Sequence, residues 1–134
     1  MKLGITGSRS ITDFDFTPFL TLRDRDFAAF CRSRFGTECA VTAVLSGGAR
    51  GIDTLAAECA AKLGLPNVIV APDRQRYPGR LIYRALRERN QRIVDNCDLL
   101  LAVWDGISQG TRDTCRRAER SGLTIYLLTP PFSS

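Results

Sequence analysis

The sequence predicts an α/β domain built on a parallel sheet, and three observations support the prediction. First, five short apolar runs recur along the chain, at residues 2–6, 40–46, 67–71, 98–104 and 124–129. Second, each run is apolar almost without interruption, as expected of strands covered on both faces. Third, helix-compatible segments separate the runs, and this alternation favours right-handed crossovers between parallel strands.

In chain order, each of the first four runs is followed by a segment that suits a helix. These expected helices span residues 18–35, 53–63, 80–96 and 111–121. Gly64 and Gly122 stand just past two of them, where a helix C-terminal cap favours glycine. We therefore expect a doubly wound sheet of about five strands in the order 3-2-1-4-5, with helices on both faces. A length of 134 residues suits a single domain over residues 1–134.

The composition excludes several kinds of catalytic and metal site. The chain has no histidine, which rules out Ser-His and Cys-His triads and leaves carboxylates as general bases. Its five cysteines are odd in number and widely spaced, which predicts reduced thiols rather than a disulfide framework or a CxxC metal pair. We expect no metal and no bound cofactor.

The formal net charge is +5, and nearly all of the basic residues are arginine, which suits bidentate contacts with phosphate or carboxylate. Arginines are dense between residues 74 and 92, where a solvated helix face is the alternative interpretation. The opening residues MKLGITGSRS do not resemble a signal peptide, and no apolar run approaches the ~20 residues that span a bilayer. We expect a soluble cytoplasmic protein that makes no membrane contact.

The stretch SGGARGID, residues 46–53, joins a strand to a helix and is the first candidate binding loop. Gly47, Gly48 and Gly51 permit positive φ and let backbone N–H groups approach a ligand, while the following helix directs its partial positive end into the same space. Phosphate fits this geometry, although the spacing matches neither a P-loop nor the standard dinucleotide fingerprint. A tight connection, with Asp53 as the helix N-cap, is the alternative.

Two further loops follow strands whose carboxyl ends lie at the same mouth of the predicted sheet. TGSRS, residues 6–10, follows the first strand, and WDGISQGT, residues 104–111, enters the last helix. The ligand crevice of a doubly wound sheet opens where strands 1 and 4 diverge, so these loops face one crevice. The predicted ligand contacts in the three loops are Gly7, Ser8, Arg9, Gly47, Gly48, Arg50, Gly51, Asp53, Asp105, Gly106, Ser108, Gly110 and Thr111.

The helix expected over residues 80–96 has polar residues on its apolar row, where Arg89 and Asn90 interrupt the pattern. A buried polar group without a partner costs on the order of 1–3 kcal/mol. Either a carboxylate or backbone partner awaits these two side chains, or they line the ligand site, and we carry both as candidate ligand contacts. We place Arg80, Arg84 and Arg87 on the outer face of this helix.

Taken together, GITGSRS, LSGGARGIDTLA, RERNQRIVD and WDGISQGT resemble the SLOG superfamily of Rossmann-like domains, named for the Smf/DprA and Lonely Guy proteins. The resemblance is closest to the short, free-standing YspA-type members and runs in order over nearly the whole chain. It implies a Rossmann-like fold with a pocket for a nucleotide or nucleotide-derived ligand, often an ADP-ribose-like species, across the glycine loops. We expect a nucleotide sensor that forms a homodimer.

An enzymatic function occurs among the same relatives. The cytokinin-activating phosphoribohydrolases have an Arg-Lys-x-x-Met segment, to whose arginine Arg89 would correspond. Their second loop reads Pro-Gly-Gly-x-Gly-Thr-x-x-Glu, which Gly110 and Thr111 match, whereas Thr114 stands at the position of the catalytic Glu and Asp113 is one residue away. If the chain is an N-glycosidic bond hydrolase acting on nucleotides, its catalytic candidates are Arg89, Asp53 and Asp113.

DNA binding is the third function that the resemblance implies. The DNA-processing recombination mediators share ARGID almost letter for letter and have a downstream Arg-Asn pair in a related setting. They bind single-stranded DNA, which the arginine content here would suit. Single-strand binders commonly add aromatic stacking platforms, and outside the strands the chain offers chiefly Tyr77 and Tyr83. Single-stranded DNA is therefore the alternative partner to a small nucleotide.

Overall fold

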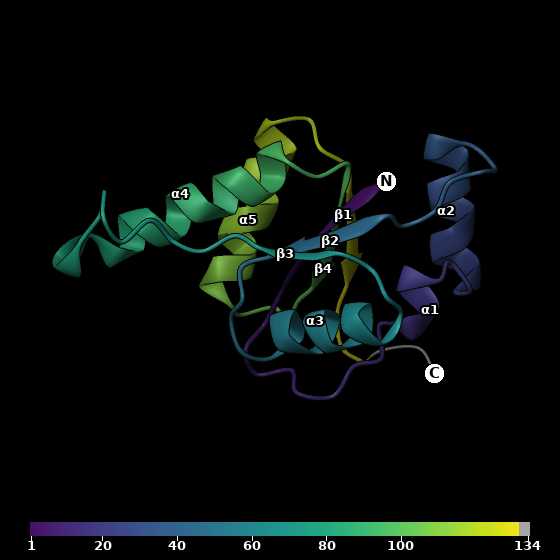
Figure 1. Cartoon of the computed structure of the whole chain (residues 1–134), viewed down its shortest axis with the longest axis horizontal. Coiled ribbons are helices and arrows are strands. Elements are labelled where there is room, and N and C mark those ends of the chain that lie inside the picture. Colours follow the sequence, from purple (N-terminus) through teal and green to yellow (C-terminus); the bar gives the residue numbers. More distant parts are fainter. Residues whose placement is uncertain (132–134) are drawn as a thin grey trace.

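A computed structural model describes residues 1–131 and shows a sheet of five parallel strands in the order β3-β2-β1-β4-β5 (Figure 1). This confirms the predicted α/β class and the strand order 3-2-1-4-5. The strands are β1 (Lys2–Gly7), β2 (Ala43–Ser46), β3 (Asn67–Ile69), β4 (Leu99–Val103) and β5 (Ile125–Leu128). The fold is Rossmann-like, because β1 and β4 are neighbours while the chain winds outward from them in both directions.

Helices cover both faces of the sheet, as the alternating sequence predicts (Figure 1). They are α1 (Thr17–Leu20), α2 (Arg25–Phe35), α3 (Ile52–Lys62), α4 (Ile82–Asp95) with the short 3₁₀ turn η1 (Gly79–Leu81) before it, and α5 (Gln109–Arg120). The N-terminal end of α4 extends well beyond the sheet. Within residues 1–131, no helix combines the length and apolar character needed to cross a membrane.

The alternation of side chains along β1 and β4 divides the core between the two faces. Leu3 and Ile5 of β1, with the odd-numbered residues of β4, face α1, α2 and α3 in the larger cluster, in which Phe27 is fully buried. Leu100 of β4 faces the opposite way and packs with Val94 of α4 and Ala118 of α5. The apolar cluster on the α4–α5 side is the smaller of the two, and polar side chains also join these two helices.

The single helix expected over residues 18–35 is wrong, because the chain forms two helices there. Leu22 has a φ of 55°, a left-handed conformation that a helix cannot contain. Asp24 then starts α2 by accepting a hydrogen bond from the Phe27 N–H at 3.0 Å. An aspartate three residues before an apolar residue is an N-cap signal visible in the sequence.

The expectation that all five strands are covered on both faces is wrong for the two edge strands, for β5, where Leu127 is 49% exposed, and more clearly for β3. Val68 and Ile69 are 48% and 54% exposed, and β3 lies at the edge of the sheet. An apolar run in the sequence predicts a strand, but it does not show that another element covers both faces of that strand. The strand is also shorter than the apolar run, since ladder pairing ends at Ile69.

Gly51 is required where the loop before α3 passes over the loop after β1. Its φ is 78°, and a Cβ added there would lie 2.6 Å from the Ser8 carbonyl oxygen. We expect Gly51→Ala to lower the free energy of unfolding by about 2 kcal/mol, because overpacking adds to backbone strain. Urea denaturation measures the change.

The matched control is Gly64→Ala, at the C-terminal end of α3. Gly64 has a similar φ of 69° but no atom within 4 Å of the added Cβ. Only the conformational cost of a left-handed alanine, about 1 kcal/mol, remains there. Equal losses in the two variants would show that the close approach at Gly51 is unimportant.

Candidate functional site

A cavity of about 700 Å³ opens at the carboxyl ends of the strands. It lies where the loops after β1 and β4 diverge to opposite faces of the sheet, which is the usual position of ligand sites in open α/β sheets. Its volume is within the range of small-molecule sites. The predicted site residues that line it are Gly7, Arg9, Gly47, Asp53, Arg89, Asn90, Asp105, Ser108, Gly110, Thr111 and Asp113.

Five predicted contacts lie outside this lining: Ser8, Gly48, Arg50, Gly51 and Gly106. Ser8 is buried, and its hydroxyl accepts a hydrogen bond from the Asp105 N–H at 2.9 Å, so it joins the loops after β1 and β4. Gly51 packs against the backbone of the β1 loop, and Gly48 lies beside Ile69. The glycine loop therefore serves first to bring backbone segments together.

Asp53 places a nearly buried carboxylate in the cavity. The helix α3 begins at Ile52 with Gly51 as its N-cap residue, so the alternative role of Asp53 as N-cap is wrong. Instead Oδ2 accepts a hydrogen bond from the Ala49 N–H at 3.1 Å, and Oδ1 has no partner within the described residues. Burial raises the pKa of Asp53 to about 6, although the Ala49 N–H and the nearby Arg89 guanidinium oppose the rise.

Arg89 and Asn90 both turn inward and have the protein partners that the sequence suggested, and both also line the cavity, while their contact with a ligand stays a prediction. The Arg89 guanidinium donates through Nη1 to the Gly47 carbonyl at 2.7 Å and through Nε to Asn90 Oδ1 at 3.1 Å. Burial lowers the pKa of Arg89, with Asp53 acting in the opposite direction. One side chain of α4 thus holds the loop after β2 in place.

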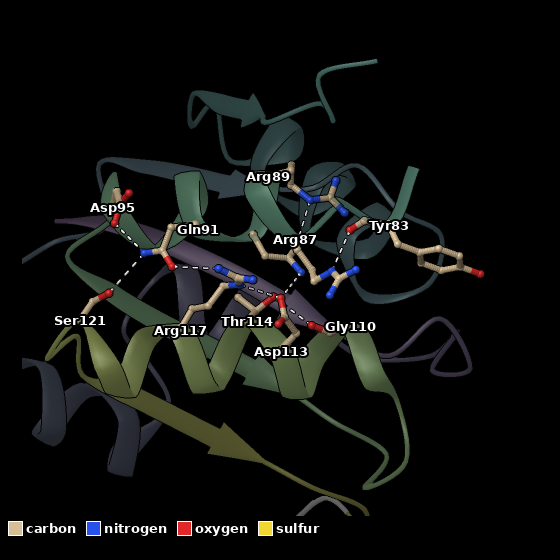
Figure 2. A network of polar contacts seen from close by, with 11 residues as sticks. Tyr83, Arg87, Arg89, Gln91, Asp95, Gly110, Asp113, Thr114, Arg117 and Ser121 are labelled. Carbon is tan, nitrogen blue, oxygen red and sulfur yellow. Dashed lines mark hydrogen bonds and ion pairs between the residues drawn. The ribbon is translucent and has the colours of Figure 1, made fainter. Parts of the chain in front are cut away.

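The network continues from α4 to α5, as Figure 2 shows. Asn90 Nδ2 donates to Asp113 Oδ2 at 3.0 Å, and Arg117 Nε donates to the same oxygen at 2.8 Å. Arg117 Nη1 also donates a hydrogen bond to Gln91 Oε1 at 3.3 Å. The Thr114 hydroxyl, at the position of the hydrolase Glu, donates to the Gly110 carbonyl at 3.0 Å. Asp113 and Thr114 are therefore engaged in joining or bracing helices.

Asp105 organises the loop that enters α5. Its Oδ1 accepts from the N–H groups of Ile107 and Ser108, both at 2.8 Å, and its Oδ2 accepts from the Ser10 hydroxyl at 2.7 Å. These hydrogen bonds, that of Ser10 first, hold the pKa of Asp105 well below its usual range. The loop is thereby held so that the start of α5 faces the cavity.

The first turn of α5 supplies backbone donors to the cavity. The N–H groups of Gln109, Gly110 and Thr111 have no acceptor inside the helix, because the first intrahelical bond runs from the Arg112 N–H to the Ser108 carbonyl. The positive end of the helix dipole adds to their attraction for an anion. This is the arrangement that the sequence WDGISQGT predicts.

Two arginines of α5 that line the cavity were missed by the sequence reasoning. Arg112 and Arg116 are one helical turn apart and lie on the same side of the helix as the cavity. Arg112 lies over the Trp104 ring, 5.5 Å from its centroid. Arg112 and Arg116 follow the predicted contact Ser108 at intervals of four residues, and this spacing is the signal that could have identified them.

Arg87 is exposed as expected, but its placement on a face away from the site is wrong, because it lines the cavity together with Tyr83. Arg87 Nε donates to the Tyr83 carbonyl at 3.2 Å, while the Tyr83 ring projects outward and is 70% exposed (Figure 2). Together the lining holds five arginines, Arg9, Arg87, Arg89, Arg112 and Arg116, and three aspartates.

Within residues 1–131, no group of three or more cysteine, aspartate or glutamate side chains is placed to hold a metal ion. Comparisons of the chain with family models, with curated proteins and with solved structures find no match.

Proposed function

We propose that this protein binds a nucleotide or nucleotide-derived ligand, such as AMP or an ADP-ribose-like species, and acts as a sensor of it. The observation that carries the proposal is the cavity of about 700 Å³ at the switch point of the sheet, whose lining has more arginines than carboxylates and includes the N-terminus of α5. The resemblance of the loop motifs to the SLOG superfamily supports the same ligand class.

The parts of the ligand can be assigned to parts of the cavity. Phosphate suits the unpaired N–H groups at Gly110 and Thr111, with Arg9 and Arg116 as flanking cations. A base suits the exposed ring of Tyr83, since aromatic rings stack on any base. This arrangement uses Arg89 mainly to position the loop at Gly47.

Removing a cationic contact should weaken binding without unfolding the protein. We expect at least one of AMP, ADP-ribose, NAD and cyclic dinucleotides to bind in calorimetry, and Arg116→Ala to weaken that binding about tenfold, as losing a charged hydrogen bond does. Arg120→Ala is the control, because Arg120 is exposed on the same helix but does not line the cavity. Equal effects of the two substitutions would place the ligand elsewhere.

Hydrolysis of the N-glycosidic bond is the second candidate, and Asp53 is the observation that favours it. Its raised pKa contrasts with the lowered pKa of Asp105 in the same cavity, a pattern seen in acid-base pairs. However, Asp113 and Thr114 are held by other groups, and the reaction needs a carboxylate that can reach the anomeric carbon.

We therefore expect no release of free adenine from AMP above the uncatalysed background, measured by chromatography over hours. Adenine release that disappears in Asp53→Asn would contradict this expectation and favour the enzyme. Release that is unchanged by that substitution would indicate a contaminating activity.

Single-stranded DNA is the remaining alternative, favoured by the exposed Arg80 of η1 and by Tyr83 and Arg84 in the first turn of α4, whose N-terminal end extends beyond the sheet (Figure 1). DNA binding would weaken steeply with salt, with a log–log slope of about −0.7 for each neutralised phosphate. Charge reversal at Arg80 and Arg84 would then abolish binding of an oligothymidylate. We expect instead that these two changes leave nucleotide binding nearly intact.

The homodimer remains a prediction. Leu81 of η1 and Tyr83 of α4 are 38% and 70% exposed where α4 begins, the end of that helix that extends beyond the sheet (Figure 1), and would suit a contact with a second copy. Sedimentation at tens of micromolar tests it, and a monomer at that concentration would remove the dimer without affecting the fold.

A further inference from the structure

The cavity contains a hydrogen-bond acceptor that lacks a donor. Asp53 is 7% exposed, lines the cavity, and has one carboxylate oxygen, Oδ1, that makes no hydrogen bond in the described part of the chain, although the Gly47 N–H is near enough to stabilise the carboxylate. Its other oxygen is held by the Ala49 N–H at 3.1 Å. Buried carboxylate oxygens are rarely left unpaired, because desolvating them without a hydrogen bond is costly. A ligand in this cavity is therefore expected to bring a donor to Oδ1.

Asp105 does not offer the same opportunity, although the sequence made it an equal candidate. Both of its carboxylate oxygens already accept hydrogen bonds, Oδ1 from the loop backbone and Oδ2 from Ser10. These contacts hold the loop that positions α5, so a ligand would have to compete with them. Of the two carboxylates, Asp53 is the one with an oxygen that accepts no hydrogen bond within residues 1–131.

A donor for the ligand lies in the same part of the cavity. Arg89 uses Nε and Nη1 in its hydrogen bonds to Asn90, Gly47 and Val70, and no hydrogen bond among residues 1–131 uses Nη2. Arg89 is also close enough to Asp53 for its charge to act on that carboxyl. Asp53 and Arg89 both line the cavity, so an acceptor and a donor that could bind a ligand belong to the same site.

We propose that Asp53 accepts a hydrogen bond from the vicinal 2′,3′-hydroxyls of a ribonucleotide, with Arg89 donating to the neighbouring oxygen, so that the site selects ribonucleotides over nucleotides that lack this diol. The inference rests on the proposed function of nucleotide binding. A diol suits this pair of groups because each hydroxyl both donates and accepts. A neutral donor also brings no second negative charge toward the carboxylate.

The sugar is favoured over the base as the source of the donor by the arrangement of the other groups. Tyr83 lines the cavity and its ring is exposed, so a base can stack on it, and the backbone donors of Gly110 and Thr111 suit the phosphate. The ribose connects base and phosphate in any nucleotide. It is therefore the part left to occupy the buried interior beside Asp53.

The test compares AMP with 2′,3′-dideoxy-AMP by calorimetry on the wild-type protein and on Asp53→Asn. We expect the wild type to bind AMP about 30-fold more tightly than 2′,3′-dideoxy-AMP, because a site built to hydrogen-bond a hydroxyl rejects an analogue that lacks it. In Asp53→Asn the ratio should fall to about threefold or less. Glu58→Gln, an exposed carboxylate on the same helix and outside this cavity, should keep the wild-type ratio.

The outcomes separate this inference from the proposed function. Equal affinity of the wild type for AMP and its dideoxy analogue overturns the diol assignment while nucleotide binding stands, and a ratio that persists in Asp53→Asn overturns the role of Asp53. If other nucleotides of the panel bind but AMP does not, the assignment also fails. If none binds, the proposed function itself is wrong. The wild-type comparison decides the selectivity even if the variant does not fold.

Discussion

Replacing Arg89 by methionine is expected to lower the free energy of unfolding by about 3–5 kcal/mol, because three acceptors lose their donor and each such loss costs up to about 1–3 kcal/mol. The guanidinium donates to the carbonyls of Gly47 and Val70 and to Asn90 Oδ1. Methionine fills much of the volume but donates to none of these oxygens. Because two of the acceptors are backbone carbonyls, no compensating substitution can remove them, and these partly buried groups lose the donor that Arg89 supplies.

The same change also removes the cation that lies near the buried carboxylate of Asp53. Chemical denaturation of the wild type, Arg89→Met and Arg84→Met measures the effect. Arg84 is exposed on the same helix, so its substitution should alter the free energy of unfolding by less than about 0.5 kcal/mol. Arg89→Lys should lie between the two, because an ammonium keeps the charge but loses the planar fork. A loss below about 1 kcal/mol in Arg89→Met would contradict the role assigned to the network.

Asp53 is expected to make the protein less stable as the pH rises through the weakly acidic range. Burial raises the pKa of this carboxyl from 3.8 in the unfolded chain to about 6 in the folded protein. Between these values the folded state holds the proton and the unfolded state does not, so unfolding releases a proton and is favoured by higher pH. The contribution is fully present below the unfolded pKa and is lost as the pH passes the folded pKa.

The size of this effect is about 3 kcal/mol, from a shift of roughly two pKa units at 1.36 kcal/mol each. Asp53→Asn does not titrate, so the free energy of unfolding of the wild type minus that of the variant should fall by this amount between roughly pH 4 and pH 7. The difference between the two proteins is the quantity to measure, because both contain Asp105. The lowered pKa of Asp105 adds to the stability of each protein an amount that is lost as the pH falls, and this amount cancels in the difference. Parallel stability profiles of the two proteins would show that Asp53 ionises normally.

The strands, the alternation of elements and the strand order followed from the sequence, because apolar runs and glycine boundaries are local signals that survive in most contexts. Gly64 and Gly122 have positive φ just past α3 and α5, as predicted. The inward orientation of Arg89 and Asn90 was also visible, because helical periodicity assigns a residue to a face. The break between α1 and α2 was missed although Asp24 signals it, because the apolar pattern continues across the break.

Which polar residues line the cavity was decided by the tertiary structure. The loops at residues 46–53 and 6–10 pack so closely that Gly51 contacts the Ser8 backbone. The Ser8 hydroxyl accepts a hydrogen bond from the Asp105 N–H, although these two residues are far apart in the sequence. Asp53 lies in the first turn of α3 because the helix begins two residues earlier than an N-cap role would require, and its Oδ1 makes no hydrogen bond among residues 1–131. Such outcomes depend on distances between segments that no local pattern encodes, so the sequence determined the fold and the loops, and packing selected the groups that face the ligand.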